Sequence, residues 1–114
     1  MKLITAEIRA KLLENGVTTA RGEDHDPHPV VKLFTPDANA TWLLVELDPE
    51  DPDLAWGLCD LGLGCPELGS VRLSEIESVR GAAGLPVERD LHFRPTKAIS
   101  AYAAEAFDRR CIGV

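Results

Sequence analysis

The run from Thr41 to Leu47 constrains the fold more than any other part of the chain, because its apolar residues do not alternate with polar ones. It reads Thr-Trp-Leu-Leu-Val-Glu-Leu, a composition rich in the β-branched and aromatic residues that favour strands. A strand with one face in water alternates apolar and polar side chains, whereas a strand buried on both faces does not. The run therefore predicts a central strand that is covered on both sides.

Four further strands are expected around this central one. Residues 30–35 and 54–61 are rich in apolar residues, a short strand is expected near residues 71–73, and residues 87–94 alternate apolar and polar side chains. Residues 48–53 contain two prolines among acidic residues and are predicted to be a loop, because proline removes a donor from a sheet ladder. Most of these strands are joined by short links, which favours antiparallel pairing.

Capping residues predict the starts of two of the three expected helices, and an Asn-Gly pair predicts the end of the first. Thr5 is placed to cap a helix over residues 6–15, which Asn15-Gly16 would end. Ser74 and Glu77 have the spacing of a capping box, which predicts a short helix starting at Ser74.

The third expected helix follows Thr96, which is predicted to cap it. Its apolar positions recur at helical spacing and are expected to pack on the sheet: Ile99, Tyr102, Ala103, Ala106 and Phe107. The 114 residues thus predict one α+β domain over residues 1–114. It has a largely antiparallel sheet of about five strands, an N-terminal helix, a short middle helix and a C-terminal amphipathic helix.

Acidic residues are concentrated in the middle of the chain. The segment from Leu33 to Val71 contains eight of them and no Lys or Arg, while the whole chain has a net charge of −7. A block of one sign repels nucleic acid and acidic membranes and attracts cations or basic protein surfaces. We therefore expect no direct nucleic-acid binding through this segment and no membrane partner.

The same charge pattern favours a non-enzymatic protein-interaction module that uses no cofactor and meets a basic protein surface. We expect the protein to be a monomer or a small homo-oligomer. Six carboxylates are the predicted partner-binding residues: Glu46, Asp48, Glu50, Asp51, Asp53 and Asp60.

The alternative is a metal-assisted hydrolase or nuclease that uses Glu46, Asp48 and Asp60, because such enzymes share an ion among carboxylates. Asp60 has a simpler explanation as well. It ends a predicted strand just before Leu61-Gly62, where its side chain would bond the backbone in an Asx turn. The same strand places Asp60 on one face with Trp56 and Leu58.

Two further groups of residues suggest binding sites of other kinds. Asp24, His25, Asp26 and His28 cluster in one polar segment, and Glu46, Asp48 and Asp53 are candidates to lie near it. The cluster is a weak pattern for a metal site and is more typical of a plain loop. Trp42 and Trp56 would form a pocket or a dimer seam if they shared one face of the sheet, which is a third candidate function.

The beginning of the chain lacks the pattern of a secretory signal, because Lys2 and Glu7 leave no room for an apolar core between them. No uncharged apolar run approaches the ~18 residues that span a bilayer. We therefore expect a cytoplasmic protein.

Seven short strings occur together over nearly the whole chain. They are PVVKLF (29–34), ATWLL (40–44), ELDP (46–49), GLCDLG (57–62), PELG (66–69), LPVERD (85–90) and FRPTK (93–97). In these strings the chain resembles the bacterial domain-of-unknown-function family 2958. The resemblance implies a small cytoplasmic protein of a kind often encoded on plasmids and other mobile elements, with no established activity. In that setting, a host defence or DNA-binding protein is a candidate partner, whose DNA groove the acidic segment would occupy.

Overall fold

A five-stranded antiparallel sheet in the order β4-β3-β2-β1-β5 forms the centre of the fold. The computed structural model describes residues 2–114. The strands are β1 (Val31–Phe34), β2 (Thr41–Asp48), β3 (Asp51–Asp60), β4 (Glu67–Arg72) and β5 (Glu88–Arg89). β2 is the central strand, as its unbroken apolar run predicts.

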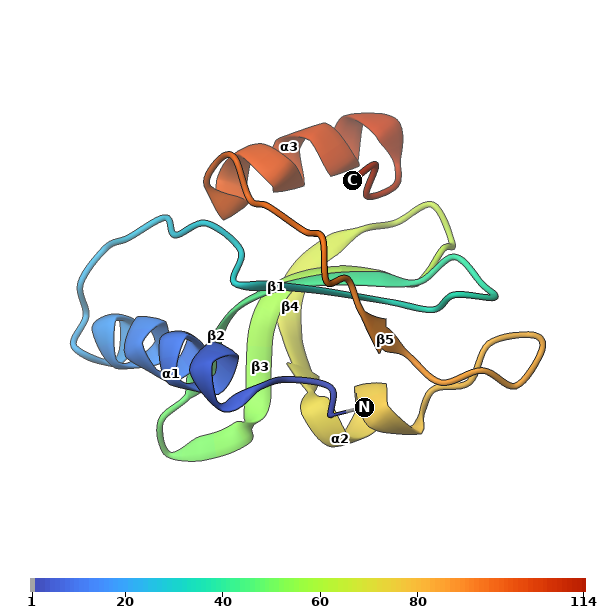
Figure 1. Cartoon of the computed structure of the whole chain (residues 1–114). Coiled ribbons are helices and arrows are strands. Elements are labelled where there is room, and N and C mark those ends of the chain that lie inside the picture. The colour runs from blue at the N-terminus through green and yellow to red at the C-terminus, as the bar shows by residue number, and fades with distance from the viewer. Residues whose placement is uncertain (1) are drawn as a thin grey trace.

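Helices cover both faces of the sheet (Figure 1). α1 (Ala6–Ala20) and α2 (Leu73–Ser78) lie on one face, where Trp42, Leu44 and Leu47 of β2 are buried. α3 (Ile99–Arg109) lies on the other face, where Leu43 and Val45 of the same strand are buried. Each of these side chains stabilises the fold by about 2 kcal/mol through burial. The expected α+β class, the antiparallel sheet and the two-sided cover of β2 are confirmed.

The first helix does not end at Asn15-Gly16 as predicted but continues to Ala20. Both residues pack on β2 instead of forming a cap. The Asn15 amide donates a hydrogen bond to the Val45 carbonyl at 2.8 Å. A Cβ at Gly16 would lie 1.8 Å from the Leu47 carbonyl oxygen, so only glycine allows this approach. The predicted helix end is wrong because Asn15 and Gly16 serve the close packing of the helix on β2 and do not form a turn.

The predicted acidic loop over residues 48–53 is shorter than expected, because β2 extends to Asp48 and β3 begins at Asp51. Pro52 therefore lies within a strand. β4 pairs with β3 only from Leu54 onward, so Pro52 interrupts no ladder on that side. β4 itself is longer than predicted, and Leu73, expected in the strand, is the first residue of α2.

The predicted helix caps at Ser74 and Thr96 are also wrong, since neither forms a local capping hydrogen bond. Distant aspartates take their place. The N–H and hydroxyl of Ser74 donate to Asp53 at 3.0 and 2.7 Å. At the start of α3, the N–H of Ser100 donates to Asp26 at 3.1 Å, and its hydroxyl bonds the same carboxylate.

The last strand and the last helix also differ in part from expectation. Only Glu88–Arg89 of the predicted strand over residues 87–94 pairs with β1. The chain then turns, and the Asp90 carboxylate accepts a hydrogen bond from the N–H of His92 at 2.8 Å. The apolar stripe of α3 is buried as predicted, except that Phe107 is 51% exposed.

Among residues 2–114, no helix is long and apolar enough to cross a membrane.

Candidate functional site

The six predicted partner-binding carboxylates lie in three different places. Asp51 and Asp53 face Arg72, Asp60 is buried at the far end of β3, and Glu46 and Asp48 line a cleft near the turn that carries the exposed Glu50. The structure therefore divides the acidic segment into groups with different surroundings.

Asp51 and Asp53 have a cationic neighbour. The Arg72 guanidinium lies 3.0 Å from the Asp51 carboxylate and 3.7 Å from that of Asp53. The hydrogen bond from the Ser74 hydroxyl, aided by Arg72, lowers the pKa of Asp53 below its ordinary value. One guanidinium thus offsets one of the two negative charges of this pair, which distinguishes it from the carboxylates of the cleft.

Asp60 holds two backbone segments together. It is 2% exposed, and one of its oxygens accepts a hydrogen bond from the N–H of Gly62 at 2.8 Å, which confirms the predicted Asx turn. The other oxygen accepts from the N–H of Ile112 at 2.9 Å. Both carboxylate oxygens are thus used in positioning the β3–β4 connection and the C-terminal segment.

The three carboxylates of the alternative hydrolase do not converge. Asp60 pairs in register with Thr41 at the start of β2, whereas Glu46 and Asp48 lie at the end of that strand. Within the described part of the chain, no three His, Cys, Asp or Glu side chains are grouped so that they could hold a metal ion. The geometry therefore offers this reaction no assembled site.

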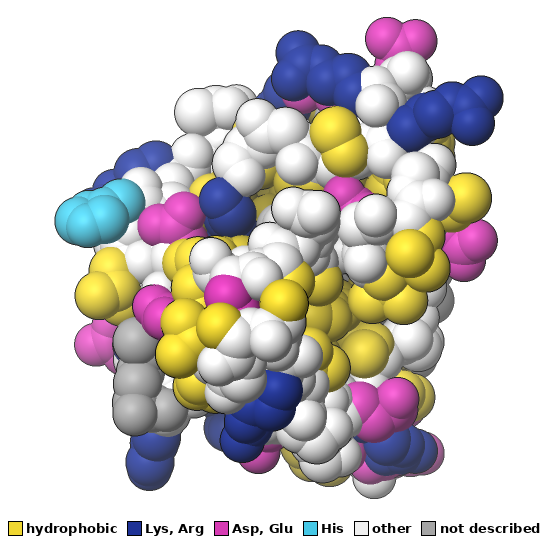
Figure 2. Space-filling view, turned by 90° about the vertical axis from the view of Figure 1, so that its right-hand side faces the viewer, with side chains coloured by type: hydrophobic (Ala, Val, Ile, Leu, Met, Phe, Trp, Pro, Cys, Tyr) yellow, Lys and Arg dark blue, Asp and Glu magenta, His cyan; other side chains and the backbone are white. Residues whose placement is uncertain are grey.

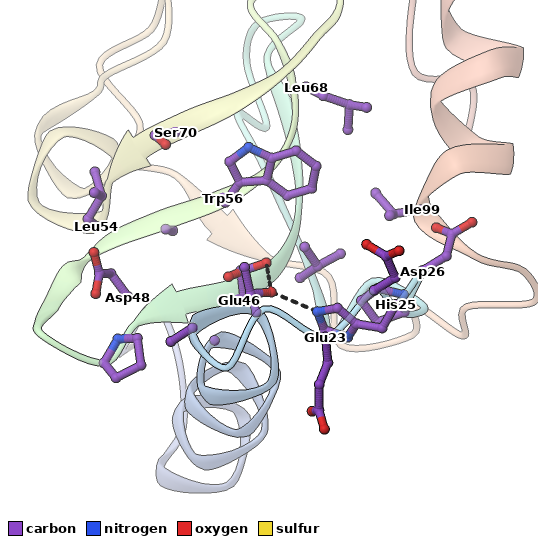
Figure 3. A pocket seen from close by; sticks show the side chains of 18 of the residues that line it. Glu23, His25, Asp26, Glu46, Asp48, Leu54, Trp56, Leu68, Ser70 and Ile99 are labelled. Atoms are coloured by element: carbon purple, nitrogen blue, oxygen red, sulfur yellow. Dashed lines mark hydrogen bonds between the residues drawn. The ribbon is translucent and has the colours of Figure 1, made fainter.

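A cleft of about 550 Å³ lies at the end of β2 where Glu46 and Asp48 are found (Figure 3). Its walls are the end of α1, the segment over residues 23–27, the start of α3 and one face of β2, β3 and β4. The volume is in the range of small-ligand pockets, which is ~300–1,000 Å³. The polar loop with Asp24, His25 and Asp26 is therefore brought against Glu46, although 20 residues or more separate them in the sequence.

Trp56 is the largest apolar side chain that lines this cleft. It pairs in register with Glu46, so the two side chains lie next to each other on the same face of the sheet. Leu54 and Leu68 extend the apolar lining (Figure 3). Trp42 is buried in the core on the opposite face, so the predicted pocket or seam shared by the two tryptophans is wrong.

A chain of hydrogen bonds connects the loop to the sheet (Figure 3). The Thr19 hydroxyl donates to Oε1 of Glu46 at 2.9 Å and lies 2.7 Å from Nε2 of His25. A hydroxyl has one proton to donate and can accept a second hydrogen bond, so Thr19 contacts both side chains at once. This arrangement connects the loop to β2 and orients the Glu46 carboxylate.

The cleft is strongly acidic. Five carboxylates line it (Glu23, Asp24, Asp26, Glu46 and Asp48), together with His25, and the lining includes no Lys or Arg. The hydrogen bond from the Ser100 hydroxyl is the main cause that lowers the pKa of Asp26, and His25 and His28 contribute.

The charge of the cleft differs from that of another side of the molecule, where Lys and Arg side chains are spread among acidic and apolar ones (Figure 2). An apolar surface beside uncompensated carboxylates is suited to a cation that carries an apolar stem.

The sequence did not indicate that Thr19 belongs to this site or that Trp56 lies next to Glu46. It did suggest that the loop with Asp24, His25 and Asp26 could lie near Glu46 and Asp48, and the cleft brings these residues together. The period-2 alternation of β3 does place Trp56 with Leu58 and Asp60 on one face, as expected. The contact between the loop and Glu46 depends on α1 continuing past Gly16, which the sequence did not predict.

Comparison with known proteins gives a family match. The model of a family described as "Protein of unknown function (DUF2958)" matches residues 3–112, which confirms the resemblance seen in the sequence. Neither the curated proteins nor the solved structures contain a significant match.

Proposed function

Because the chain belongs to the DUF2958 family, whose function is unknown, we propose its role from the cleft itself. The protein is a non-enzymatic interaction module that receives a Lys or Arg side chain of a basic partner protein between Trp56 and Glu46. The observation that supports this proposal is a carboxylate next to a half-buried tryptophan ring, in a cleft lined by five acidic residues and no basic one.

Each part of a long basic side chain finds a complementary surface there. Leu54 and Leu68 flank Trp56 on opposite sides, so the methylene stem would pack against one of these two leucines while the charged end lies over the ring of Trp56. A cation over a tryptophan ring contributes about 0.5–2 kcal/mol, depending on how well water is excluded. A hydrogen bond to an ionised carboxylate contributes about 1.5–3 kcal/mol.

Glu46 is prepared for this contact before the ligand arrives. Thr19 holds Oε1 by a 2.9 Å hydrogen bond, and Oε2 has no protein hydrogen bond among the described residues. A group that is already oriented loses less conformational freedom on binding, which favours affinity. Arginine suits the site best, because its planar guanidinium stacks on an aromatic ring and also bonds a carboxylate.

Cytoplasmic nucleic-acid-binding proteins are the partner class to test first, including those of host defence. Their nucleic-acid grooves display the Arg and Lys side chains that the cleft would accept. In this form of the proposal a single side chain is bound in a pocket, and the carboxylates do not imitate a row of phosphates. That distinction follows from Asp51 and Asp53, which face Arg72, and from Asp60, which is buried.

Calorimetric titration with a short arginine peptide tests the proposal. Glu46→Gln removes one negative charge from the cleft, and the matched control Glu77→Gln removes one from the exposed surface of α2. We expect Glu46→Gln to weaken binding about ten-fold or more, which corresponds to about 1.4 kcal/mol. The control should leave binding nearly unchanged. Equal effects of the two substitutions would show that only the overall charge attracts the peptide and would refute the proposal.

A further inference from the structure

β4 is an open edge of the sheet. It pairs with β3 on one side only, and no backbone hydrogen bond to its other side is present among residues 2–114. The edge on the other side of the sheet, β5, is only two residues long, whereas β4 has six. A long edge strand presents a row of unpaired N–H and C=O groups to any extended chain nearby.

This edge has few of the features that prevent strand addition. Natural edge strands are protected by charged side chains, lysine above all, by proline or by a β-bulge. β4 contains no Pro or Lys, its two charged residues, Glu67 and Arg72, stand at its ends, and its pairing with β3 has no irregularity of register. A Cβ added at Gly69 would meet nothing within 4 Å, so no packed group covers the face of the sheet opposite the cleft at the middle of this strand.

The open edge is continuous with the acidic cleft. Leu68 and Ser70 of β4 line the cleft together with Trp56, and Leu68 is 37% exposed. Side chains of an extended chain point to alternate faces, with ~7 Å between neighbours on one face. A strand next to β4 would therefore present every second side chain to the face of the sheet that carries the cleft.

We propose that the partner binds through an extended basic segment that adds as a strand to the free edge of β4, with alternate Arg or Lys side chains on the cleft face. The inference rests on the proposed function and specifies how the cleft is reached. Main-chain hydrogen bonds would supply affinity, and the cleft would select basic side chains at alternate positions.

Charge complementarity favours a basic partner over a second copy of this chain. Each copy carries a net charge of −7, and pairing through β4 would bring the acidic clefts of two copies toward the same interface. Like charges brought together oppose association. A basic segment gains from the same carboxylates.

Backbone methylation of a probe peptide tests the inference. The probe is a blocked hexapeptide of alternating Val and Arg, compared with one analogue N-methylated at every Arg and another N-methylated at every Val. Backbone N–H groups of a strand point alternately to its two sides, so only one analogue loses the donors that face β4. We expect that analogue to bind about ten-fold or more weakly, while the other binds like the parent. Outward-facing amides of β4 should also exchange more slowly with the parent peptide bound.

The outcomes separate this inference from the proposed function. If both analogues bind like the parent, or both lose binding equally, while Glu46→Gln still weakens the parent, strand addition is wrong and the cleft proposal stands. If the parent does not bind, or binds without dependence on Glu46, the proposed function fails first. A dimer that protects the β4 amides without peptide would overturn the inference in favour of a second copy.

Discussion

Gly16→Ala tests the contact that positions α1, and with it one wall of the cleft. On helix propensity alone this substitution stabilises a helix by about 1 kcal/mol. The structure predicts the opposite, because the new Cβ would lie 1.8 Å from the Leu47 carbonyl oxygen and 3.3 Å from the Pro49 ring. The neighbours are a backbone atom and a proline ring, neither of which can rotate away.

The magnitude follows from the two contacts that the helix must give up. Forcing extra volume into a packed interface costs about 1–3 kcal/mol. Movement of α1 away from β2 also breaks the buried 2.8 Å hydrogen bond from Asn15 to Val45, which costs about 1–3 kcal/mol. After the gain in helix propensity, we expect a net loss of about 2–3 kcal/mol, or a decrease of about 10 °C in Tm.

Thermal unfolding followed by circular dichroism measures this effect. Ala10→Gly, at an exposed position of the same helix, is the matched control and should cost about 1 kcal/mol through propensity alone. Both substitutions should therefore destabilise, with the larger loss at Gly16. An unchanged or higher Tm for Gly16→Ala would refute the close packing of α1 on β2.

Three further predictions concern other parts of the fold. Asp37→Ala removes the acceptor of two backbone N–H groups in the 81–85 loop and should cost about 2 kcal/mol in urea unfolding. The pKa values of Asp26 and Asp53 are lowered by folding, so the unfolded chain binds protons first on acidification. Their stabilisation is present above the ordinary carboxylate pKa and is lost as the pH falls through the folded values. Asp26→Asn should therefore flatten the decrease of Tm in acid. Burial raises the pKa of Cys59 to about 11, so alkylation near neutral pH should add two labels by intact mass, and a third only after unfolding.

The central strand was predictable because its signal is local and dominant. A run of apolar residues on both faces can be satisfied only between two layers, and the structure buries Leu43 and Leu44 on opposite faces of β2. The stripe of α3 was predictable for the same reason, since its spacing directly encodes one buried face. Phe107 shows the limit of that rule, because it lies at the edge of the stripe and remains half exposed.

The helix caps and the site were less predictable, because they depend on contacts between distant segments. Ser74 has a local capping pattern, yet its hydrogen bonds go to Asp53, 21 residues earlier. Ser100 is bonded by Asp26, 74 residues away. Local sequence does not indicate which distant carboxylate accepts the hydrogen bonds at the start of a helix.

The candidate site also depends on contacts between distant segments. The sequence showed that residues 33–71 are acidic, but it did not show that the structure separates their carboxylates into groups with different surroundings. Asp60 is used by backbone hydrogen bonds, and Asp53 is shared between Ser74 and Arg72. The cleft that results depends on Trp56 lying next to Glu46, which requires the register of β2 on β3, including the shift between Leu44 and Glu46.

The most direct measurement of the central claim is an NMR titration with a blocked single arginine, following the indole N–H signals of the two tryptophans. Trp56 lines the cleft, whereas Trp42 is 2% exposed on the opposite face and serves as an internal control. We expect the Trp56 signal to shift and saturate, the Trp42 signal to stay in place, and Glu46→Gln to weaken the response. If neither signal moves, or both move together, the cleft does not receive an arginine side chain.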